Sequence, residues 1–278
     1  MFIVLGFIVF IMLYPFVYMI AVSLSDSISI LQNKVTFYPK GFNLTSYKIV
    51  FRDPRIFTAY KNTIIYVAVG TLISLAFTGL AAYALSKKDR LIGAKFFNIL
   101  ILVTMFFSGG MIPKYLVVKD LGILNTTWAV ILPSAISAWN LIIMRSFFDE
   151  FPKDIEDSGR IDGLNDYGVL WYLVLPTSGA VLSTIGLFYA VSIWNSFMEP
   201  FLYLQDKARF PLQVILRDIV LLGSNFDNQA ASAVGDSVVI EDSLKFATII
   251  VSVVPIIAVY PYIQKYFVKG VMIGSIKG

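Results

Sequence analysis

The sequence predicts an all-α protein that crosses a membrane with about six helices. Hydrophobic residues make up 58% of the 278 residues, and charged residues make up only 14%. A typical soluble domain has about 25% charged residues, so this chain has too few to cover a surface that faces water. Apolar stretches recur along the chain, each close to the length of about 20 residues that one bilayer crossing requires.

The expected helices follow the apolar runs in order. The predicted spans cover residues 2–23, 62–85, 96–111, 126–144, a stretch between 166 and 199, and 246–263. The first run has no basic leader and no small-residue cleavage site after it, so we expect a membrane helix rather than a signal peptide. Prolines inside the spans predict kinks. They are Pro15, Pro133, Pro176, Pro255 and Pro261.

Orientation follows from the basic residues in the short loops, because Lys and Arg favour the cytoplasmic side. The loop after the second span has more of them than the next loop, with Lys87, Lys88, Arg90 and Lys95 against Lys114 and Lys119. This favours a cytoplasmic location for the first of these loops, and therefore for both termini. The polar segments 26–60 and 199–245 are then expected outside, where a binding protein can contact them.

Several classes of chemistry are excluded by what the sequence lacks. It contains no Cys and no His, which removes Cys/His zinc sites, Cys nucleophiles, Ser-His triads and haem attachment. No Gly-Lys dipeptide occurs, so the phosphate loop G-x-x-x-x-G-K-[ST] is absent. We therefore expect no catalytic, cofactor or metal site in this chain. The sequence also lacks a basic cluster of the kind that binds nucleic acid.

The most informative segment is the acid-rich stretch at residues 151–176, FPKDIEDSGRIDGLNDYGVLWYLVLP. Acidic residues soon after Pro152 favour a helix start, because negative charge stabilises the positive end of the helix dipole. Gly163 can end this helix in the left-handed conformation, and Asn165 can cap the next one. The segment therefore predicts a short helix, a sharp bend at Gly163 and then a longer helix.

The same segment resembles the Glu-Ala-Ala signature loop of bacterial ABC-importer permeases. That motif reads E-A-A, three residues, G, nine residues, I-x-L-P. Asp157-Ser158-Gly159 stands at the E-A-A positions, Gly163 at the glycine, and Leu173-Val174-Leu175-Pro176 at I-x-L-P. Aspartate replaces glutamate and Ser-Gly replaces Ala-Ala, so the charge and the small size are kept.

The resemblance extends over most of the chain. The runs SGGMIPKYLVVKDLGILNTTWAVILPSAISAWNLIIMRSFF and YFVKGVMIGSIKG are similar to the second permease subunit of carbohydrate importers, in the branch for complex oligosaccharides and polysaccharide fragments. The resemblance implies a type I ABC-importer permease fold with a cytoplasmic coupling helix at 153–163. It divides the chain into a first helix with an external segment at 1–60, a permease core at 61–264 and a cytoplasmic tail at 265–278.

The resemblance also implies partners in a bacterial inner membrane. The chain forms a heterodimer with a second permease, two cytoplasmic ATPase subunits bind ATP and Mg²⁺, and an external solute-binding protein delivers an oligosaccharide. The chain itself is then a transport subunit and not an enzyme. It moves the substrate by alternating access.

The signature loop carries the coupling roles that the resemblance implies. The assigned residues are Asp157, Ser158, Gly159, Arg160, Asp162, Gly163 and Pro176. Asp157 is assigned to polar docking on an ATPase, and Ser158 and Gly159 to close approach. Arg160 and Asp162 are assigned to ion pairing, and Gly163 to the bend. Pro176 ends the rigid helix that carries the motion to the membrane helices.

A substrate path is predicted near the outer end of the fifth span. Trp194 and Asn195 suit a sugar, whose apolar ring face stacks while its hydroxyls form hydrogen bonds. The weaker candidates are Tyr189, Trp139 and Asn140. Anchoring at the membrane interface is the competing interpretation of Trp194, and helix packing is the competing one for the other aromatic residues.

A secondary transporter or channel for a small polar solute is the alternative function. It requires ionisable residues within the membrane or half-length broken helices, and the sequence shows neither clearly. A membrane enzyme requires clustered Asp, Glu or His at membrane depth, which this sequence lacks. The sugar stays open between a neutral oligosaccharide, an acidic uronate oligomer and a polyol phosphate.

Overall fold

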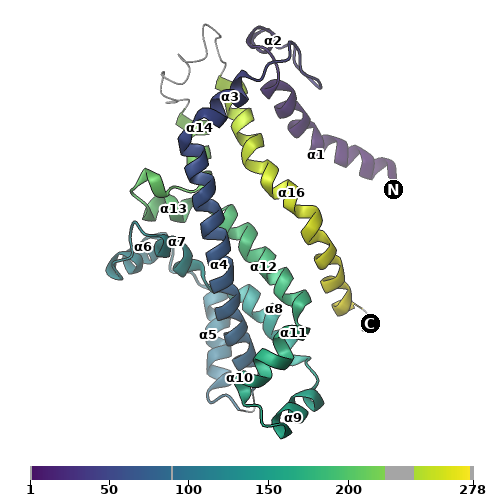
Figure 1. Ribbon diagram of the computed structural model, residues 1–278, viewed down its shortest axis with the longest axis vertical. Helices are drawn as coiled ribbons and strands as arrows, with labels where there is room; N and C mark the ends of the chain where they lie inside the picture. The colour runs from purple at the N-terminus through teal and green to yellow at the C-terminus, as the bar shows by residue number, and fades with distance from the viewer. Residues whose placement is uncertain (1, 89, 223–240, 276–278) are drawn as a thin grey trace. The chain divides into compact units, whose positions relative to one another are not determined.

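The computed structural model describes residues 2–88, 90–222 and 241–275, and this part of the chain contains helices and no strand (Figure 1). It divides into two compact units, each described by itself: Met1–Asn62 with Lys207–Val259, and Thr63–Asp206 with Tyr260–Gly278. The prediction of an all-α protein is confirmed.

The first unit begins with a long apolar helix. Its elements are α1 (Phe2–Ser23), α2 (Ser27–Leu31), α3 (Thr45–Arg52), the start of α4 (Pro54–Ser86), a 3-10 turn at Lys207–Arg209, α14 (Leu212–Leu222) and the first part of α16 (Glu241–Ser275). The bounds of α1 agree with the predicted first span. Ala21 and Val22 at its end pack with Val35, whereas the side chains before Tyr18 are exposed, as expected for a helix surrounded by lipid.

A capped turn follows α1. The Ser29 N–H donates to the Asp26 carboxylate at 2.7 Å, which caps α2. Hydrogen bonds from the Ser29 side chain and backbone lower the pKa of Asp26. Gly41 lies against this cap in the left-handed conformation, with φ +61°, and a Cβ at Gly41 would lie 2.4 Å from Asp26 Oδ2.

The helix α4 begins earlier than predicted. Pro54 is the first residue of α4, eight residues before the start of the predicted span at residue 62. Proline suits this position because the first N–H groups of a helix have no partner within the helix. The Asp53 carboxylate then accepts the Arg55 N–H at 2.8 Å, so an N-cap extends the helix toward the N-terminus.

The second unit contains the remaining helices. They are α4 from Thr63 on, α5 (Ala94–Phe106), α6 (Met111–Asp120), α7 (Thr127–Ile131), a 3-10 turn at Leu132–Ser134, α8 (Ala138–Asp149), α9 (Lys153–Ile161), α10 (Asp166–Val169), a π-helical turn at Leu170–Val174, α11 (Leu175–Thr177), α12 (Gly179–Trp194) and α13 (Met198–Tyr203). Its core joins α4, α8, the π-helical turn and α12, through buried side chains such as Ala82, Met144, Val174 and Ile185.

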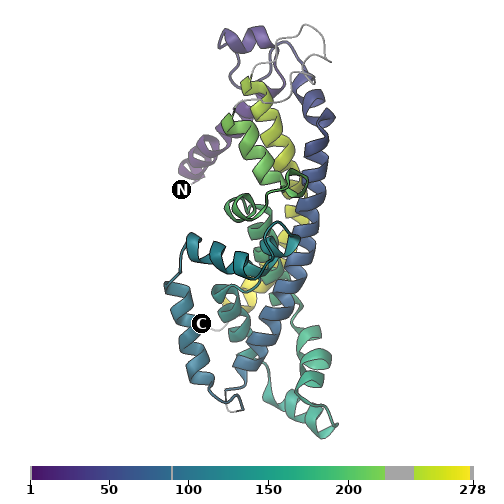
Figure 2. The same ribbon diagram turned by 90° about the vertical axis from the view of Figure 1, so that its left-hand side faces the viewer.

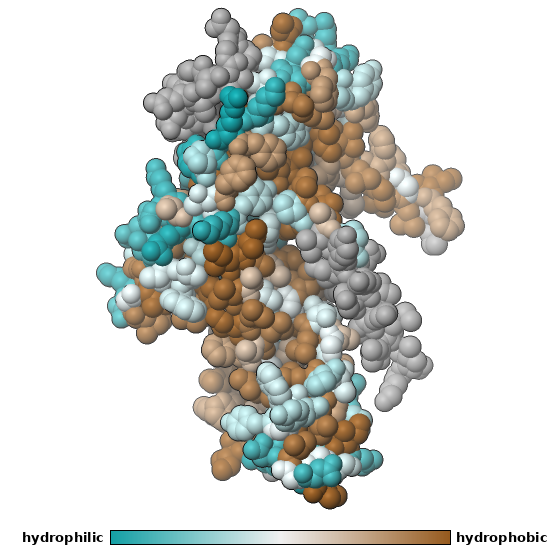
Figure 3. Space-filling model, viewed as in Figure 1, coloured by the Kyte–Doolittle hydropathy of each residue, from teal (hydrophilic) through white to brown (hydrophobic). Residues whose placement is uncertain are grey.

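Two helices, α1 and α4, are each long and apolar enough to cross a membrane. Three bent pairs pass the same test together, which gives up to five spans in the described residues: α5 with α6 (119°), α7 and its 3-10 turn with α8 (53°), and α10–α11 with α12 (84°). The sixth predicted span, 246–263, falls in α16 and extends past the side chains that the structure describes. Apolar side chains also cover much of the face in Figure 3.

Glycine, proline and hydroxyl groups explain the bends within these pairs. Gly110 has φ +84°, so Met111 starts α6 and does not end the third span. Pro133 lies in the 3-10 turn that ends α7. After Pro176, the Ser178 N–H donates to Leu175 O at 3.1 Å, and the Ser178 hydroxyl donates to the freed Val174 O at 2.6 Å.

Replacing Gly41 with alanine is expected to destabilise the α2 cap. The new Cβ would clash with Asp26, and the alanine would have to adopt φ +61°. Together these effects are expected to lower the free energy of unfolding by about 1–3 kcal/mol. Thermal unfolding in detergent checks this, with Gly6→Ala as the matched control, because a Cβ at Gly6 meets nothing within 4 Å. Equal midpoints for the two variants would contradict the close contact.

Candidate functional site

The short helix α9 is the part of the signature segment that stands out from the second unit. It lies at the extreme end of this unit in both views (Figure 1 and Figure 2). It begins directly after Pro152, with Asp154 and Glu156 in its first turn and Arg160 in its last. Nine residues give a length of about 14 Å. The prediction of a short helix here is confirmed.

The end of α9 follows the predicted pattern. Gly163 has φ +89°. Its N–H donates to Arg160 O at 3.0 Å, and the Leu164 N–H donates to Gly159 O at 2.9 Å, which satisfies the last carbonyls of the helix. Asn165 then accepts the Gly168 N–H at 2.8 Å and caps the next helix. The left-handed bend at Gly163 and the cap at Asn165 are confirmed.

The two faces of α9 differ in character. Glu156 and Gly159, three residues apart, are buried against the rest of the unit. Asp157 and Ser158 are exposed, and the Ser158 hydroxyl donates to Asp154 O within the helix. Ile161 is 87% exposed. The outward face therefore presents acids, a hydroxyl and a large apolar side chain to whatever approaches.

Gly159 packs inward, against this chain's own residues. A Cβ at position 159 would lie 2.6 Å from Leu173 Cδ1 and 3.3 Å from Leu164 Cδ1. The chain itself therefore requires a small residue at this position. Its predicted contact with an ATPase stays a prediction.

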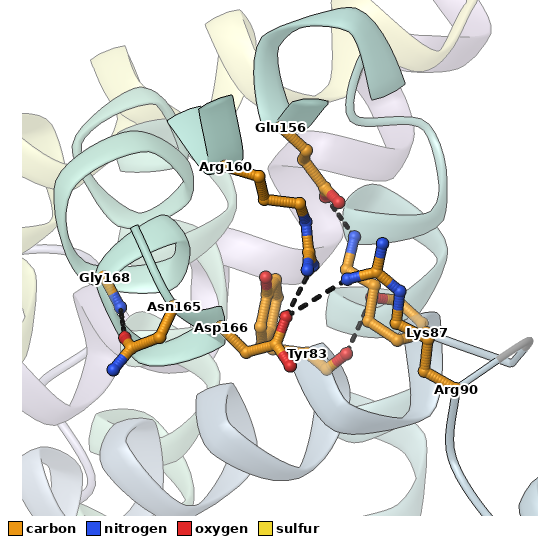
Figure 4. A network of polar contacts seen from close by, with 9 residues as sticks. Tyr83, Lys87, Arg90, Glu156, Arg160, Asn165, Asp166 and Gly168 are labelled. Carbon is orange, nitrogen blue, oxygen red and sulfur yellow. Dashed lines mark hydrogen bonds and ion pairs between the residues drawn. The ribbon is translucent and has the colours of Figure 1, made fainter. Parts of the chain in front are cut away.

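Polar side chains hold the inner face of α9 (Figure 4). Glu156 pairs with Lys87, which follows α4, and the Lys87 Nζ lies 4.9 Å from the centre of the Tyr83 ring. Arg160 pairs with Asp166 of α10. From the sequence, Lys87 was predicted only to mark the cytoplasmic side, and Glu156 was not predicted as a site residue. The available signal was the spacing of Glu156 and Gly159, which are three residues apart and therefore lie on the same face of a helix.

The other predicted coupling residues lie at the two ends of this segment. Asp162 ends α9, is exposed, and has no ion pair with any described residue. Pro176 lies in α11. The longer helix predicted after Asn165 runs only to Thr177, because the chain bends by 84° before α12. It also contains a π-helical turn.

A cavity of about 750 Å³ lies in the second unit between α7–α8 and α12–α13. Three of the predicted substrate-path residues line it: Trp139, Asn140 and Tyr189. Trp139 is 58% exposed, whereas Asn140 and Tyr189 are buried. The hydroxyls of Ser134, Ser137, Ser192 and Ser196 belong to residues of the same lining. Aromatic faces, an amide and hydroxyls thus surround one space.

Two hydrogen bonds to the Tyr189 hydroxyl hold this residue in the cavity wall. The Ser137 N–H donates to the Tyr189 hydroxyl at 3.0 Å. Thr78 of α4 lies 2.7 Å from the same oxygen, and either hydroxyl can donate. Tyr189 is 3% exposed, so it fixes the cavity wall and offers little surface to a ligand.

Two charged residues line the cavity, and the sequence analysis missed both. Lys114 Nζ lies 3.7 Å from Glu199 Oε1. Trp194 and Asn195, the first candidates from the sequence, are outside the lining. Asn195 ends α12 and donates its side-chain N–H to Val191 O. The register of α12 turns Tyr189, and not the next two candidates, toward the cavity.

Comparisons with known proteins bear on this arrangement. Residues 56–273 match the family described as binding-protein-dependent transport system inner membrane component. The chain is 42% identical over 264 residues to the polygalacturonan/rhamnogalacturonan transport system permease protein YtcP of Bacillus subtilis (strain 168), which covers 95% of this chain and 92% of that protein. It is 28% identical to the arabinooligosaccharides transport system permease protein AraQ of Halalkalibacterium halodurans, over 98% of this chain and 94% of that one.

The fold is also that of a solved transporter chain. A crystal structure of a bacterial ABC transporter involved in the import of the acidic polysaccharide alginate contains a chain with a TM-score of 0.90 and 34% sequence identity, over 95% of this chain and 94% of that one. The predicted ABC-importer permease fold is confirmed. The chain belongs to the family of binding-protein-dependent transport system inner membrane components, as a permease subunit of an ABC importer.

Proposed function

We propose that the chain is the second permease subunit of a bacterial importer for oligosaccharides, with α9 as its coupling helix. It pairs with a different permease subunit, two cytoplasmic ATPases bind ATP and Mg²⁺, and an external protein delivers the substrate. The outward face of α9 is the observation that carries this proposal. An exposed acid, a hydroxyl and the 87% exposed Ile161 form a small amphipathic surface, which suits a cleft on a soluble partner.

Coupling then follows from how α9 is connected. ATP-driven closure of the ATPases pushes α9, in which Asp157 and Ser158 face the partner. The Gly163 bend passes the motion to the helical segment 166–177 and on to the membrane helices, which reorient between inward-open and outward-open states. Arg160 pairs with Asp166, which joins α9 to α10 across the bend. This end of the second unit, and both termini, are cytoplasmic, in keeping with the basic loop after α4.

The cavity is the proposed substrate path, and its chemistry suits a sugar. Trp139 offers a ring face for stacking, and Asn140 and the serine hydroxyls offer hydrogen-bond partners. Relatives are named for polygalacturonan, rhamnogalacturonan and alginate, which favours an acidic oligosaccharide. Lys114 is the cation in the lining and supplies a partner for a uronate carboxylate.

Co-purification tests the assembly. A tagged copy of the chain, extracted from its native membrane in mild detergent, is expected to bring a second permease and an ATPase in a ratio of one to one to two. Mass spectrometry of the purified complex measures this ratio. A stable homodimer that transports without an ATPase would contradict the proposal.

Replacing Gly163 with valine is expected to uncouple ATP hydrolysis from uptake. A β-branched residue is strained at φ +89°, so the bend changes and the import rate falls about tenfold or more, while the complex still assembles and hydrolyses ATP. Uptake and ATPase rates in liposomes measure the effect. Gly122→Val is the matched control, because Gly122 has φ +68° but lies at the end of α6. Similar transport by both variants would overturn the coupling role of the bend.

Lys114→Gln is expected to weaken uptake of acidic oligosaccharides selectively. The change leaves Glu199 without its ion pair partner and makes the cavity more negative, so uptake of trigalacturonate falls about tenfold for a loss of about 1.4 kcal/mol. Competition between trigalacturonate and a neutral trisaccharide measures selectivity. Glu199→Gln is the matched control and should retain or increase acidic uptake. Equal losses for both sugars would argue against carboxylate recognition.

A further inference from the structure

The loop that follows α4 is paired with three different helices. Each of its basic residues contacts an acid on another element: Lys87 with Glu156 of α9, Lys88 with Asp149 at the end of α8, and Arg90 with Asp166 of α10. We call these six residues the α4 ion-pair cluster. A topology signal requires only that the charges stay on one side of the membrane, so it does not account for this one-to-one pairing.

The central pair of the α4 ion-pair cluster is buried. The side chain of Glu156 is 9% exposed and that of Lys87 is 19% exposed. A buried carboxylate is strongly destabilising without a counter-charge. The ammonium group of Lys87 also lies over the face of Tyr83, about one helical turn back along the chain, so it is fixed from both sides. The inner face of α9 is thus anchored to the end of α4.

The outer pairs extend this contact into a network. Asp149 lies 3.3 Å from Lys88 and 3.6 Å from Arg145 of α8. Asp166 lies 3.4 Å from Arg90 and also pairs with Arg160 of α9. Single exposed pairs contribute little, but here each acid is shared by a cation of the α4 loop and a cation of another helix. Figure 4 shows the part of the network that converges on Asp166.

The helix α4 also contacts the wall of the cavity. Thr78 lies on α4, nine residues before Lys87, which is about 14 Å along a helix. Its hydroxyl meets the hydroxyl of Tyr189, a residue of the cavity wall, and the same oxygen accepts the Ser137 N–H at the start of α8. One continuous helix therefore connects the inner face of α9 with the wall of the cavity.

We infer that the α4 ion-pair cluster makes α4 a second, direct route from the coupling helix to the substrate cavity, beside the route through Gly163 and α10–α12. This inference rests on the proposed function of α9. In it, Lys87 and Glu156 are positioning residues: they keep α9 and α4 together as one body while the ATPases move α9. The cavity wall at Tyr189 is then displaced in step with α9.

The absence of cysteine from the sequence allows a reversible test. In the variant Lys87→Cys with Glu156→Cys, the ion pair is lost, and a short, reducible bifunctional thiol reagent can restore the connection. The full transporter is reconstituted in liposomes with its partner chains made cysteine-free. The measured quantity is the number of trigalacturonate molecules imported per ATP hydrolysed. The two single-cysteine variants, treated with the same reagent, are the matched controls.

The expected result is loss and rescue. Without reagent, the double variant imports about tenfold less substrate per ATP than the unaltered chain, and cross-linking returns it toward the unaltered ratio until a reductant reverses it. A purely structural role would lower assembly and leave this ratio unchanged. An unaltered ratio before cross-linking overturns the inference, and so does a cross-linked form that hydrolyses ATP but cannot import.

A second variant covers a failure of the double variant to assemble. Lys88→Gln with Arg90→Gln removes the two outer pairs, whose basic side chains are about half exposed. It should lower the import per ATP several-fold, about fivefold, whereas Lys95→Gln on α5, which has no ion pair with any described residue, should not. If the two variants import the same amount of substrate per ATP, the inference is overturned. Absence of ATP-driven uptake by the unaltered chain would instead refute the proposed function, and the inference with it.

Discussion

Backbone hydrogen bonding without water is the constraint on which this fold depends. In the interior of a bilayer each N–H and C=O group needs a partner within the protein, so the described residues form helices, and side chains replace lost backbone bonds at two of the breaks. At the bend before α12, the Ser178 hydroxyl satisfies the carbonyl of Val174. At the start of α8, the Ser137 N–H finds the hydroxyl of Tyr189. The bend at the start of α8 and the cavity wall thus use the same side chain, that of Tyr189.

This constraint explains why broken helices do not separate transporter classes here. Half-length helices were expected to mark a secondary transporter, yet three bent pairs occur in a permease of an ABC importer. Gly110 allows a bend through its left-handed conformation, Pro133 through its missing N–H, and Ser178 through a hydroxyl that replaces a lost backbone bond, all without any ion-binding chemistry. The bends report how the chain passes through the membrane, and the family is carried by the signature segment.

Local features were predictable from the sequence, and long-range pairings were not. The bounds of α1, the start of α9 and the left-handed Gly163 follow from apolar length, helix-dipole chemistry and the need for a residue without a Cβ. The contact between Lys87 and Glu156 joins residues 69 positions apart, and no periodicity encodes such a distance. Likewise, the sequence favoured Trp194 over Tyr189, but packing places Tyr189 in the cavity lining and leaves Trp194 outside it.

The contact between Gly159 and Leu173 has a consequence for how the signature motif varies. The motif has alanine and isoleucine at these two positions, and this chain has glycine and leucine. The leucine Cδ1 occupies the place where a Cβ at position 159 would be, at 2.6 Å from it, whereas the β-branched isoleucine is shorter and bulkier near its backbone. The two departures therefore compensate each other in shape and not in total volume. The methyl group that Gly159 lacks leaves room for the longer reach of Leu173 across the elbow between α9 and the helix that follows it.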